Sequence, residues 1–572
     1  MYDDYDCLRE KHTGMTQHIE SDEIILQKSK SISNEKATVS NIATIVTEID
    51  GNTVPVLLSI ICLIISILLS ELTMKIMILI FVVLILIVYF TYQKINSTGN
   101  WPNVIGTTYH VPFGDVPAMQ ACLDGHYLLN LNTKLGKPQV YRIWVGPTPV
   151  LLLAHPDAVR QFWQQHDEAS IERVVHLGWS LLLIMGEGIG FKTYRNRNRI
   201  NRFFHACFGI KQVKYFETSY EYQIDLVMQR LQSRVIDACD TPLDVSSQFR
   251  YLALDAGLDM FLGTKSSRYL SQLHELVDEL AVVMLATFNA RYVNIPGLRW
   301  FIPYTYYLRS KILTLRHKWN NLLRIIMNEY LREDNIEIDA DGDSILVRYL
   351  RMERIGRKKE ITYEELSDTM IEGLLAPSDG IAATVANTLI LLALNPEAQI
   401  EARERILNRL PPGIEKTVTL TDLDDLDHLD HILLECQRLL PLFVFNVPEL
   451  TSCKMTLCGV TVPKETMVMY DVQTLNRCED IWPKPMIFQP ERFQLLNEKQ
   501  RKALHGFGNG RSRRCLGENF VHSLHKLLIA RILLAYQLEP VDNERDIDKL
   551  SRIRRPFIYV PRVVLKFIPI KN

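Results

Sequence analysis

The sequence predicts a mainly α-helical domain with a minor β portion, an α+β fold, preceded by one or two transmembrane helices. Three observations lead to this prediction. Residues 177–410 show a mostly helical apolar pattern, whose longest run covers 363–410. Short β-rich runs flank that region on both sides. Two apolar runs near the N-terminus, of about 17 and about 15 residues, are just long enough to cross a bilayer as helices.

The composition excludes some classes of protein. The chain has 572 residues, a formal net charge of -2 and no basic stripe, so nothing favours nucleic acid binding. Its length can bury a large core and ordinarily suggests two or more domains. The 10 cysteines form no CxxC pair and no disulfide framework, which favours a reducing compartment.

The N-terminal region has two parts. Residues 1–53 are polar, mixed in charge and poor in aromatic side chains, and we expect a largely disordered leader. Residues 54–92 are the predicted membrane anchor, with apolar runs at 54–70 and 76–90. Either both runs span the membrane as a helical hairpin, or one spans and the other packs at the interface. A cleaved signal peptide is disfavoured, because the apolar region starts more than fifty residues into the chain.

A globular domain follows the anchor. Residues 93–112 are expected to be a proline-containing linker, and the domain is expected to span 113–572. The runs 140–144 and 149–153 predict a β-hairpin, and a helix opens at 154–157. The other predicted elements are a helix at 424–440, strand pairs near 457–469 and 558–567, and a helix at 516–538.

The strongest chemical signal is the glycine-rich segment 507–517, which contains Cys515. Glycines let a loop approach a planar cofactor and aim backbone N–H groups at one atom. Cys515 is expected at the start of the following helix, where the positive end of the helix dipole stabilises a thiolate. A thiolate is a ligand that donates electron density to haem iron. The alternatives are a phosphate-binding loop, which the poor strand at 502–505 argues against, and a buried structural cysteine.

Three further segments place charged or helix-breaking residues in an apolar setting. Glu435 and Arg438 face the same side of an apolar helix, where two charges must satisfy each other. Arg492, within 488–493, offers Glu435 a second guanidinium. Pro377 is expected to open a long helix, because it has no N–H and its ring clashes with a carbonyl one turn back.

Taken in their order along the chain, these segments resemble the cytochrome P-450 superfamily over residues 113–572. The resemblance implies the family's mainly α fold, a haem b (iron-protoporphyrin IX with an axial thiolate) and O₂ activation with electrons from a reductase. It implies that Cys515 is the ligand to the iron and that Arg513 pairs with a haem propionate. Phe507 stands for the aromatic residue that the family places seven positions before the cysteine, where this chain has Gly508.

The same resemblance gives roles to residues outside the cysteine loop. Glu435, Arg438 and Arg492 would form the family's structural triad. Asp379 matches the acid that precedes a threonine alcohol in the family's central helix, but Gly380 replaces that threonine. Asp379 is therefore the predicted catalytic residue, which delivers protons through ordered water, a neighbouring serine or a substrate hydroxyl.

The chain departs from the family at both other propionate contacts. Residues 194–202 lack the family's tryptophan, and the sequence leaves open which arginine of 195–202 binds a propionate. No arginine follows Pro441, and Asn446 is the candidate substitute. The apolar residues 442–445 would line the substrate pocket.

The sequence therefore predicts a haem-thiolate monooxygenase of the endoplasmic reticulum membrane, with its catalytic domain facing the cytosol. It would insert one oxygen atom from O₂ into an apolar small molecule, using electrons from NADPH. The predicted partners are NADPH-cytochrome P-450 reductase, with cytochrome b5 as a second candidate donor, and membrane lipid. Arg511, Arg513 and Arg514 would either dock an acidic redox partner or serve a propionate and solvent. Two alternatives stay open: an isomerase or dehydratase that does not use O₂, and a non-catalytic haem-binding membrane protein.

Overall fold

The structure, a computed structural model, describes residues 59–65, 75–79, 82–83, 101, 103–122, 125–166, 183–190, 194–237, 242–290, 292, 295, 299–332, 343–356, 360–410, 418–508, 513–541, 544–550, 552–554 and 558–570. The chain divides into two compact units, Met1–Gln93 and Lys94–Asn572. In the first unit the described residues are helical and their apolar side chains are exposed, Leu63 at 61% and Met77 at 69%. The expected leader at 1–53 and most of the expected anchor at 54–92 lie outside the described residues.

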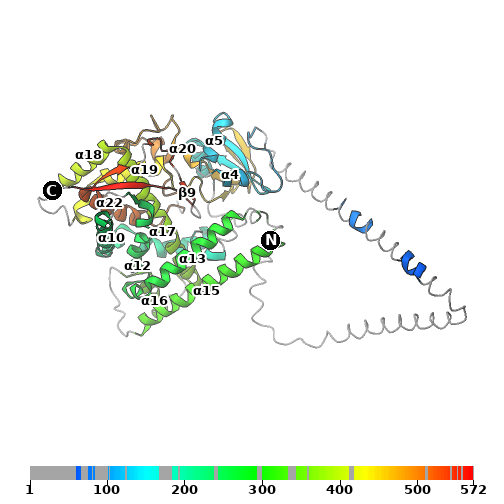
Figure 1. The fold of residues 1–572 in the computed structure, drawn as a ribbon, viewed down its shortest axis with the longest axis horizontal. Coiled ribbons are helices and arrows are strands. Elements are labelled where there is room, and N and C mark those ends of the chain that lie inside the picture. The colour runs from blue at the N-terminus through cyan, green and yellow to red at the C-terminus, as the bar shows by residue number, and fades with distance from the viewer. Residues whose placement is uncertain are drawn as a thin grey trace. The chain divides into compact units, whose positions relative to one another are not determined.

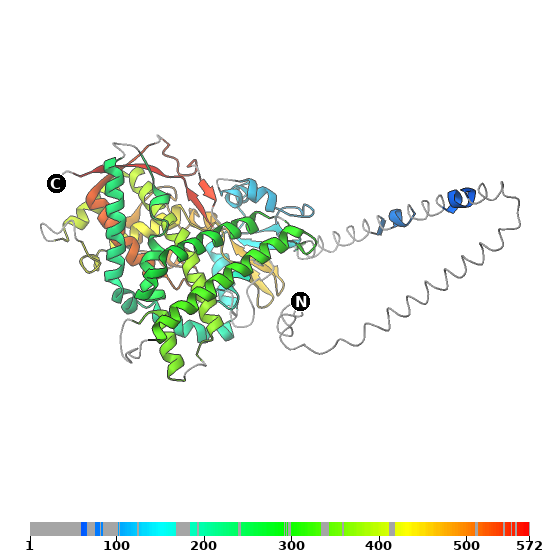
Figure 2. The same cartoon turned by 60° about the horizontal axis from the view of Figure 1, so that its bottom comes forward.

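The second unit is mainly helical, in agreement with the predicted fold class (Figures 1 and 2). Its 3-10 helices are η4 (Thr264–Tyr269), η6 (Thr421–Leu423) and η7 (Pro490–Phe493). Its α-helices are α4 (Val116–Ala121), α5 (Tyr127–Lys134), α6 (Pro156–Gln165), α8 (Tyr194–Cys207), α9 (Ile210–Tyr215), α10 (Glu217–Asp237), α11 (Val245–Gln248), α12 (Leu252–Phe261), α13 (Leu270–Asn289), α15 (Pro303–Leu331), α16 (Ile345–Arg354), α17 (Tyr363–Leu394), α18 (Pro396–Leu407), α19 (Asp427–Leu439), α20 (Val472–Asn476), α21 (Glu498–Ala503) and α22 (Glu518–Ala535). In both views α13 and α15 lie side by side, and they pack against each other.

The largest sheet confirms the predicted hairpin. Strands β1 (Val140–Val145) and β2 (Thr148–Leu153) pair antiparallel. On its other edge β2 pairs in parallel with β7 (Met467–Tyr470), and β7 carries the short strand β4 (Glu449–Leu450). The hydroxyl of Tyr141 donates to the carboxylate of Asp471 at 2.9 Å in the buried interior, across 330 residues of sequence. The sheet thus joins the beginning of this unit to its last third.

Part of the segment expected to be a linker packs on this sheet. Trp101 is buried, and Gly106 forms a β-bridge with Arg142. The carboxylate of Asp115 accepts from the backbone N–H of Trp144 at 2.7 Å. Gly114 has φ +62°, and a Cβ there would lie 2.4 Å from the carbonyl oxygen of Trp144. Only glycine permits this close approach, which lies at the start of the predicted domain.

Helix α17 is the central helix of the unit, and it packs against α12, α19 and α22. A capping box begins it: the Thr362 side chain accepts from the Glu365 N–H, and the Glu365 carboxylate accepts from the Thr362 N–H. By length and composition it is the one described helix apolar enough to cross a membrane, but 78% of its most apolar stretch is buried in the fold. It is therefore a core helix.

The prediction that Pro377 opens this helix is wrong, since α17 runs without a break from Tyr363 to Leu394. The proline lacks one N–H, but the helix is buried before it at Leu374 and after it at Ile381. Packing on both sides outweighs the loss of one hydrogen bond. The predicted run to residue 410 is instead divided at Pro396, where α18 begins.

The C-terminal elements follow the prediction with two corrections: one helix ends earlier, and the strands near 558–567 pair with other strands rather than with each other. Helix α19 lies within the predicted 424–440, but α22 ends at Ala535 rather than at residue 538. The residues after Ala535 form β8 (Tyr536–Pro540), because they pair with β11 (Val564–Pro569), which also pairs with β3 (Leu243–Asp244). The two remaining pairs are β5 (Met455–Leu457) with β6 (Val460–Val462), and β9 (Arg552–Arg554) with β10 (Tyr559–Pro561).

Candidate active site

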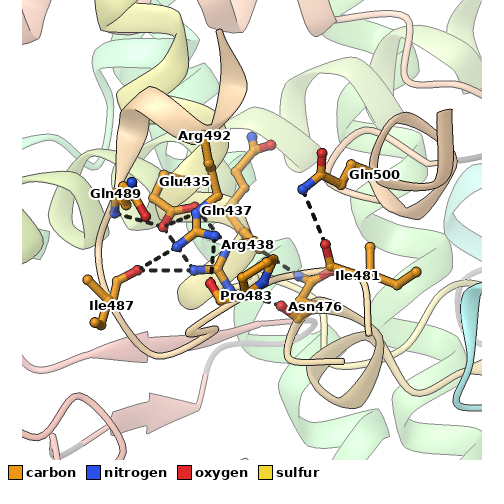
Figure 3. Close-up of polar contacts among 10 residues, drawn as sticks. All are labelled: Glu435, Gln437, Arg438, Asn476, Ile481, Pro483, Ile487, Gln489, Arg492 and Gln500. Atoms are coloured by element: carbon orange, nitrogen blue, oxygen red, sulfur yellow. Dashed lines mark hydrogen bonds and ion pairs between the residues drawn. The ribbon is translucent and has the colours of Figure 1, made fainter. Parts of the chain in front are cut away.

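Three charged side chains from two elements meet in a buried network. Glu435 and Arg438 lie one turn apart on α19, and Arg492 lies on η7 (Figure 3). Arg438 donates from Nε and Nη2 to the two carboxylate oxygens of Glu435 at 2.7 and 2.9 Å. Arg492 donates from Nε to Glu435 Oε1 at 3.1 Å. The structure therefore brings together all three members of the predicted triad.

Backbone groups complete this network (Figure 3). The Gln489 N–H donates to Glu435 Oε1 at 2.9 Å, and Arg438 Nη1 donates to the Asn476 carbonyl at 2.9 Å. The carbonyl of Ile487 accepts from Nη2 of Arg492 at 3.1 Å. Burial lowers the pKa of Arg492, and the nearby Glu435 carboxylate opposes that shift. With both charge and hydrogen bonding satisfied, the triad fixes the segment around η7 to α19.

Cys515 lies in the loop that precedes α22. Its backbone N–H donates to the carbonyl of Phe507 at 2.8 Å, which closes the loop on itself. The first residue of α22 is Glu518, so the cysteine lies before the helix rather than at its start. The Cys515 side chain is exposed, although protein surrounds the sulfur closely enough for burial to raise the pKa of its thiol. The Gly517 N–H and the Arg514 guanidinium oppose that rise. Burial thus opposes the expected stabilisation of a free thiolate, whereas a bound metal ion would favour the thiolate form.

The other predicted residues of the loop, Arg513 and Phe507, contact side chains outside the loop. Arg513 is buried, and its Nε lies 3.3 Å from Oε1 of the equally buried Glu449 on β4. The Phe507 ring lies against the ring of His522, with centroids 5.2 Å apart. Gly508 has φ +82°, and a Cβ there would lie 2.9 Å from the Arg513 carbonyl oxygen, so the turn requires glycine. Residues 509–512, which include the predicted docking residue Arg511, lie outside the described part of the chain.

The middle of α17 has an open face. Ala376 is exposed in the middle of this mostly buried helix, and a Cβ on Gly380 would meet no atom within 4 Å. Asp379 is half-buried next to Gly380. The hydroxyls of Ser378 and Thr384 donate to helix carbonyls, those of Leu375 and Gly380, at 2.8 and 2.9 Å. Both hydroxyls keep oxygen lone pairs that can still accept a hydrogen bond.

Residues 442–445, expected to line the pocket, do not all lie in one place, and Asn446, the candidate propionate ligand, already has a partner. Leu442 packs against Ala383 of α17 and Ile558, whereas Phe445 packs into the core beside the β1–β2 sheet. The side-chain oxygen of Asn446 accepts from the backbone N–H of Tyr470 at 2.6 Å, so this amide is used within the fold.

Among the arginines of 195–202, Arg199 forms an ion pair with Glu365 at the start of α17, and Arg202 is exposed. The side chains of residues 194–198 lie outside the part of the chain that the structure describes. Sequence reasoning missed Glu449, the partner of Arg513, because no motif links the two positions.

Comparison with known proteins gives a consistent result. The family model described as Cytochrome P450 matches residues 123–560. "Cytochrome P450 monooxygenase opdB" of Penicillium oxalicum is 24% identical over 427 residues, which cover 72% of this chain and 81% of that protein. "Cytochrome P450 71B5" of Arabidopsis thaliana is 23% identical and "Cytochrome P450 4F1" of Rattus norvegicus is 26% identical; the alignments cover 64% and 71% of this chain, and 74% and 79% of those proteins.

Proposed function

The chain belongs to the cytochrome P450 family of haem-thiolate oxidoreductases, and from this membership we propose that it is a membrane-anchored monooxygenase. We propose that it inserts one oxygen atom from O₂ into an apolar small molecule, with electrons from NADPH delivered by a reductase. The observation that carries the proposal is Cys515, an exposed thiol in a closed loop in front of α22, within the matched region.

The residues of this loop fit a haem. Cys515 is exposed, and Gly380 and Ala376 leave space on the central helix. Cys515 would bind the iron through its thiolate. Arg513 would hold a propionate while it also pairs with Glu449, which a guanidinium with five N–H donors can do. Phe507 would support the loop through its carbonyl and its ring. When bound, the haem iron with its thiolate ligand supplies the chemistry that activates O₂.

We assign proton delivery to Asp379. Its carboxyl group lies half-buried on α17, one residue before the space left by Gly380. A carboxyl group in this position can take a proton from solvent and pass it on through ordered water. Ser378 and Thr384 each keep an acceptor lone pair and can anchor such a water.

The chemistry of the lining supports an apolar substrate. The open face of α17 presents Ala376 and Gly380, and Leu442 packs beside Ala383 on the same helix. Small and aliphatic groups of this kind favour hydrocarbon-rich ligands, because desolvation of apolar surface drives their binding.

Membrane attachment and electron supply complete the proposal. The described helical residues of the first unit expose isoleucine, leucine and methionine side chains, which a lipid bilayer would cover. We place the anchor in the endoplasmic reticulum membrane and the catalytic domain in the cytosol, with NADPH-cytochrome P-450 reductase as electron donor and cytochrome b5 as a second candidate. Arg514, in the cysteine loop, pairs with Glu518, but its side chain is 66% exposed and its guanidinium has further N–H donors for an acidic partner.

A second candidate function is isomerisation or dehydration without O₂. The specific observation in its favour is Gly380, which leaves the central helix without the threonine alcohol found in the family.

An isotope experiment decides between the two. The full-length, haem-loaded protein is incubated with the reductase, NADPH and apolar candidate substrates under ¹⁸O₂. The monooxygenase predicts substrate-dependent NADPH consumption and one ¹⁸O atom in the product. A product formed without NADPH and without label would assign the rearrangement activity instead.

A further inference from the structure

A histidine and two glutamates meet away from the cysteine loop. Glu401 is on α18, His428 is near the start of α19, and Glu491 is on η7. One nitrogen of the imidazole and one oxygen of each carboxylate all lie within 4.8 Å of one another. The three side chains come from three separate elements, so the cluster is a product of the tertiary fold.

His428 is buried, and no described residue forms a hydrogen bond with its ring. Only 5% of its surface is exposed, and neither ring nitrogen has a hydrogen-bond partner within the described part of the chain. A buried polar group without a partner is unfavourable, and the large majority of such groups in proteins are satisfied by protein, water or an ion. The two carboxylates lie near the imidazole but do not accept a hydrogen bond from it. A cation bound between the three side chains would provide the imidazole and both carboxylates with a partner.

We propose that Glu401, His428 and Glu491 bind a divalent metal ion, with Zn²⁺ as the best match. One imidazole nitrogen and two carboxylate oxygens are ligands that zinc accepts at about 2.0–2.2 Å, with water completing the coordination. Ligand atoms around a tetrahedral ion at these distances lie about 3.3–3.6 Å apart, so separations of up to 4.8 Å require the side chains to close by about 1 Å. Ca²⁺ and Mg²⁺ are disfavoured, because both prefer oxygen ligands alone.

One neighbouring charge opposes the ion. Arg405, one turn along α18, donates to Oε1 of Glu401 at 2.9 and 2.7 Å. Both bonds end on the same oxygen, so Oε2 of Glu401 accepts neither. The guanidinium repels a cation, and its removal should therefore tighten metal binding.

A second group of possible ligands provides a comparison. His155, Cys478 and Asp480 also lie within 4.8 Å of one another. This group is a weaker candidate, because Nδ1 of His155 accepts from the Asp157 N–H and Asp480 is exposed. It therefore serves as an internal control.

The proposed ion has a structural role. It would join α18 and η7 to α19, the helix that carries Glu435 and Arg438. Because Glu491 is the neighbour of Arg492, the ion would hold the η7 segment from one side while the triad holds it from the other.

The experiment uses the full-length, haem-loaded protein in detergent, purified with a tag that contains no histidine. After dialysis against a chelator, Zn²⁺ is added back, and bound zinc is measured against haem iron by mass spectrometry and by calorimetric titration. We expect one zinc ion per haem and a rise in Tm with zinc. His428→Gln and Glu491→Gln should each weaken zinc binding at least about tenfold and remove the rise in Tm. Arg405→Gln should strengthen binding.

Matched variants give the controls. Glu404→Gln, in an exposed position of the same helix as Glu401, and Asp480→Asn, in the second group, should bind zinc like the wild type. If His428→Gln fails to load haem, the half-buried Glu491→Gln variant decides. Unchanged zinc binding in Glu491→Gln overturns the proposal, as does loss of binding in Asp480→Asn alone. Failure of the wild type to bind zinc below millimolar concentration overturns it as well.

Discussion

The guanidinium of Arg438 donates two hydrogen bonds to the carboxylate of Glu435, and neither side chain has any exposed surface. Removal of Arg438 therefore takes two charge-assisted hydrogen bonds from the buried Glu435 carboxylate, which keeps those from Arg492 and the Gln489 N–H. Arg438→Ala should destabilise the protein by about 3–5 kcal/mol, and haem-free, misfolded protein should result. The measurement is haem content together with denaturant unfolding. Arg409→Ala, which removes an exposed pair with Asp425, should cost no more than about 1 kcal/mol.

Substitution of the proposed iron ligand tests the cysteine loop. Cys515→Ser should abolish the red-shifted absorption of the ferrous haem–CO complex, because a hydroxyl is a poor substitute for a thiolate donor. Cys453→Ser, at an exposed cysteine elsewhere, should leave that absorption unchanged. Survival of the absorption in Cys515→Ser would remove this residue from the iron.

Asp379→Asn tests the proposed proton path. General acid catalysis contributes about 10²–10⁴-fold, so turnover should fall within that range while haem and substrate binding stay nearly intact. Because a water chain constrains proton transfer less than a fixed alcohol does, we also expect the wild type to release reduced O₂ as peroxide with substrates that lack a hydroxyl. The measurement compares NADPH consumed with product and peroxide formed. Glu364→Gln, exposed at the start of the same helix, is the control. Matched NADPH and product in Asp379→Asn, at wild-type rate, would move the proton path to Thr384.

Acid stability should depend on His525. Its Nε2 lies 2.8 Å from the hydroxyl of Thr388, and burial lowers the pKa of His525 to about 3. In the unfolded chain the pKa is about 6.5, so between these values only the unfolded state binds the proton. Stability therefore falls as the pH falls below 6.5, by about 1.4 kcal/mol per pH unit from this group.

At pH 5 the loss from His525 reaches about 2 kcal/mol. Chemical unfolding at pH 7 and pH 5 should show a smaller pH effect in His525→Gln than in the wild type. Replacement of the exposed His317 by glutamine should leave the pH effect unchanged. An equal pH effect in His525→Gln and the wild type would contradict the assignment.

The anchor can be tested by protease protection. We propose a helical hairpin, which places the N-terminus and the catalytic domain on the same, cytosolic face of the membrane. In sealed microsomes a protease should then digest both an N-terminal tag and the catalytic domain, while a lumenal marker stays intact. A protected tag beside a digested catalytic domain would show a single span.

Local spacing explains why the triad could be predicted. Glu435 and Arg438 lie three residues apart on a helix, so their pairing follows from helix geometry and the apolar surroundings. The pairing of Arg513 with Glu449 could not be predicted in this way. It depends on how β4 packs beside the cysteine loop, and that placement is set by the whole sheet.

Tertiary packing also explains the two errors in helix boundaries. Pro377 has the sequence properties of a helix breaker, yet α17 continues through it between buried neighbours. The apolar pattern of α22 continues past Ala535, but β11 offers a pairing edge that turns Tyr536 and its successors into a strand. In both cases distant partners decide what local propensity leaves open.

The bond between Tyr141 and Asp471 has a consequence for biosynthesis. Its two ends are separated by 330 residues, and the parallel pairing of β2 with β7 spans a similar stretch of the chain. At ribosomal rates of about 5–20 residues per second, roughly 15–70 s pass between the synthesis of the two ends. During that time β2 has an unpaired edge, the kind of edge that recruits strands from other chains. A nascent chain of this protein should therefore depend on chaperones until its last third has left the ribosome.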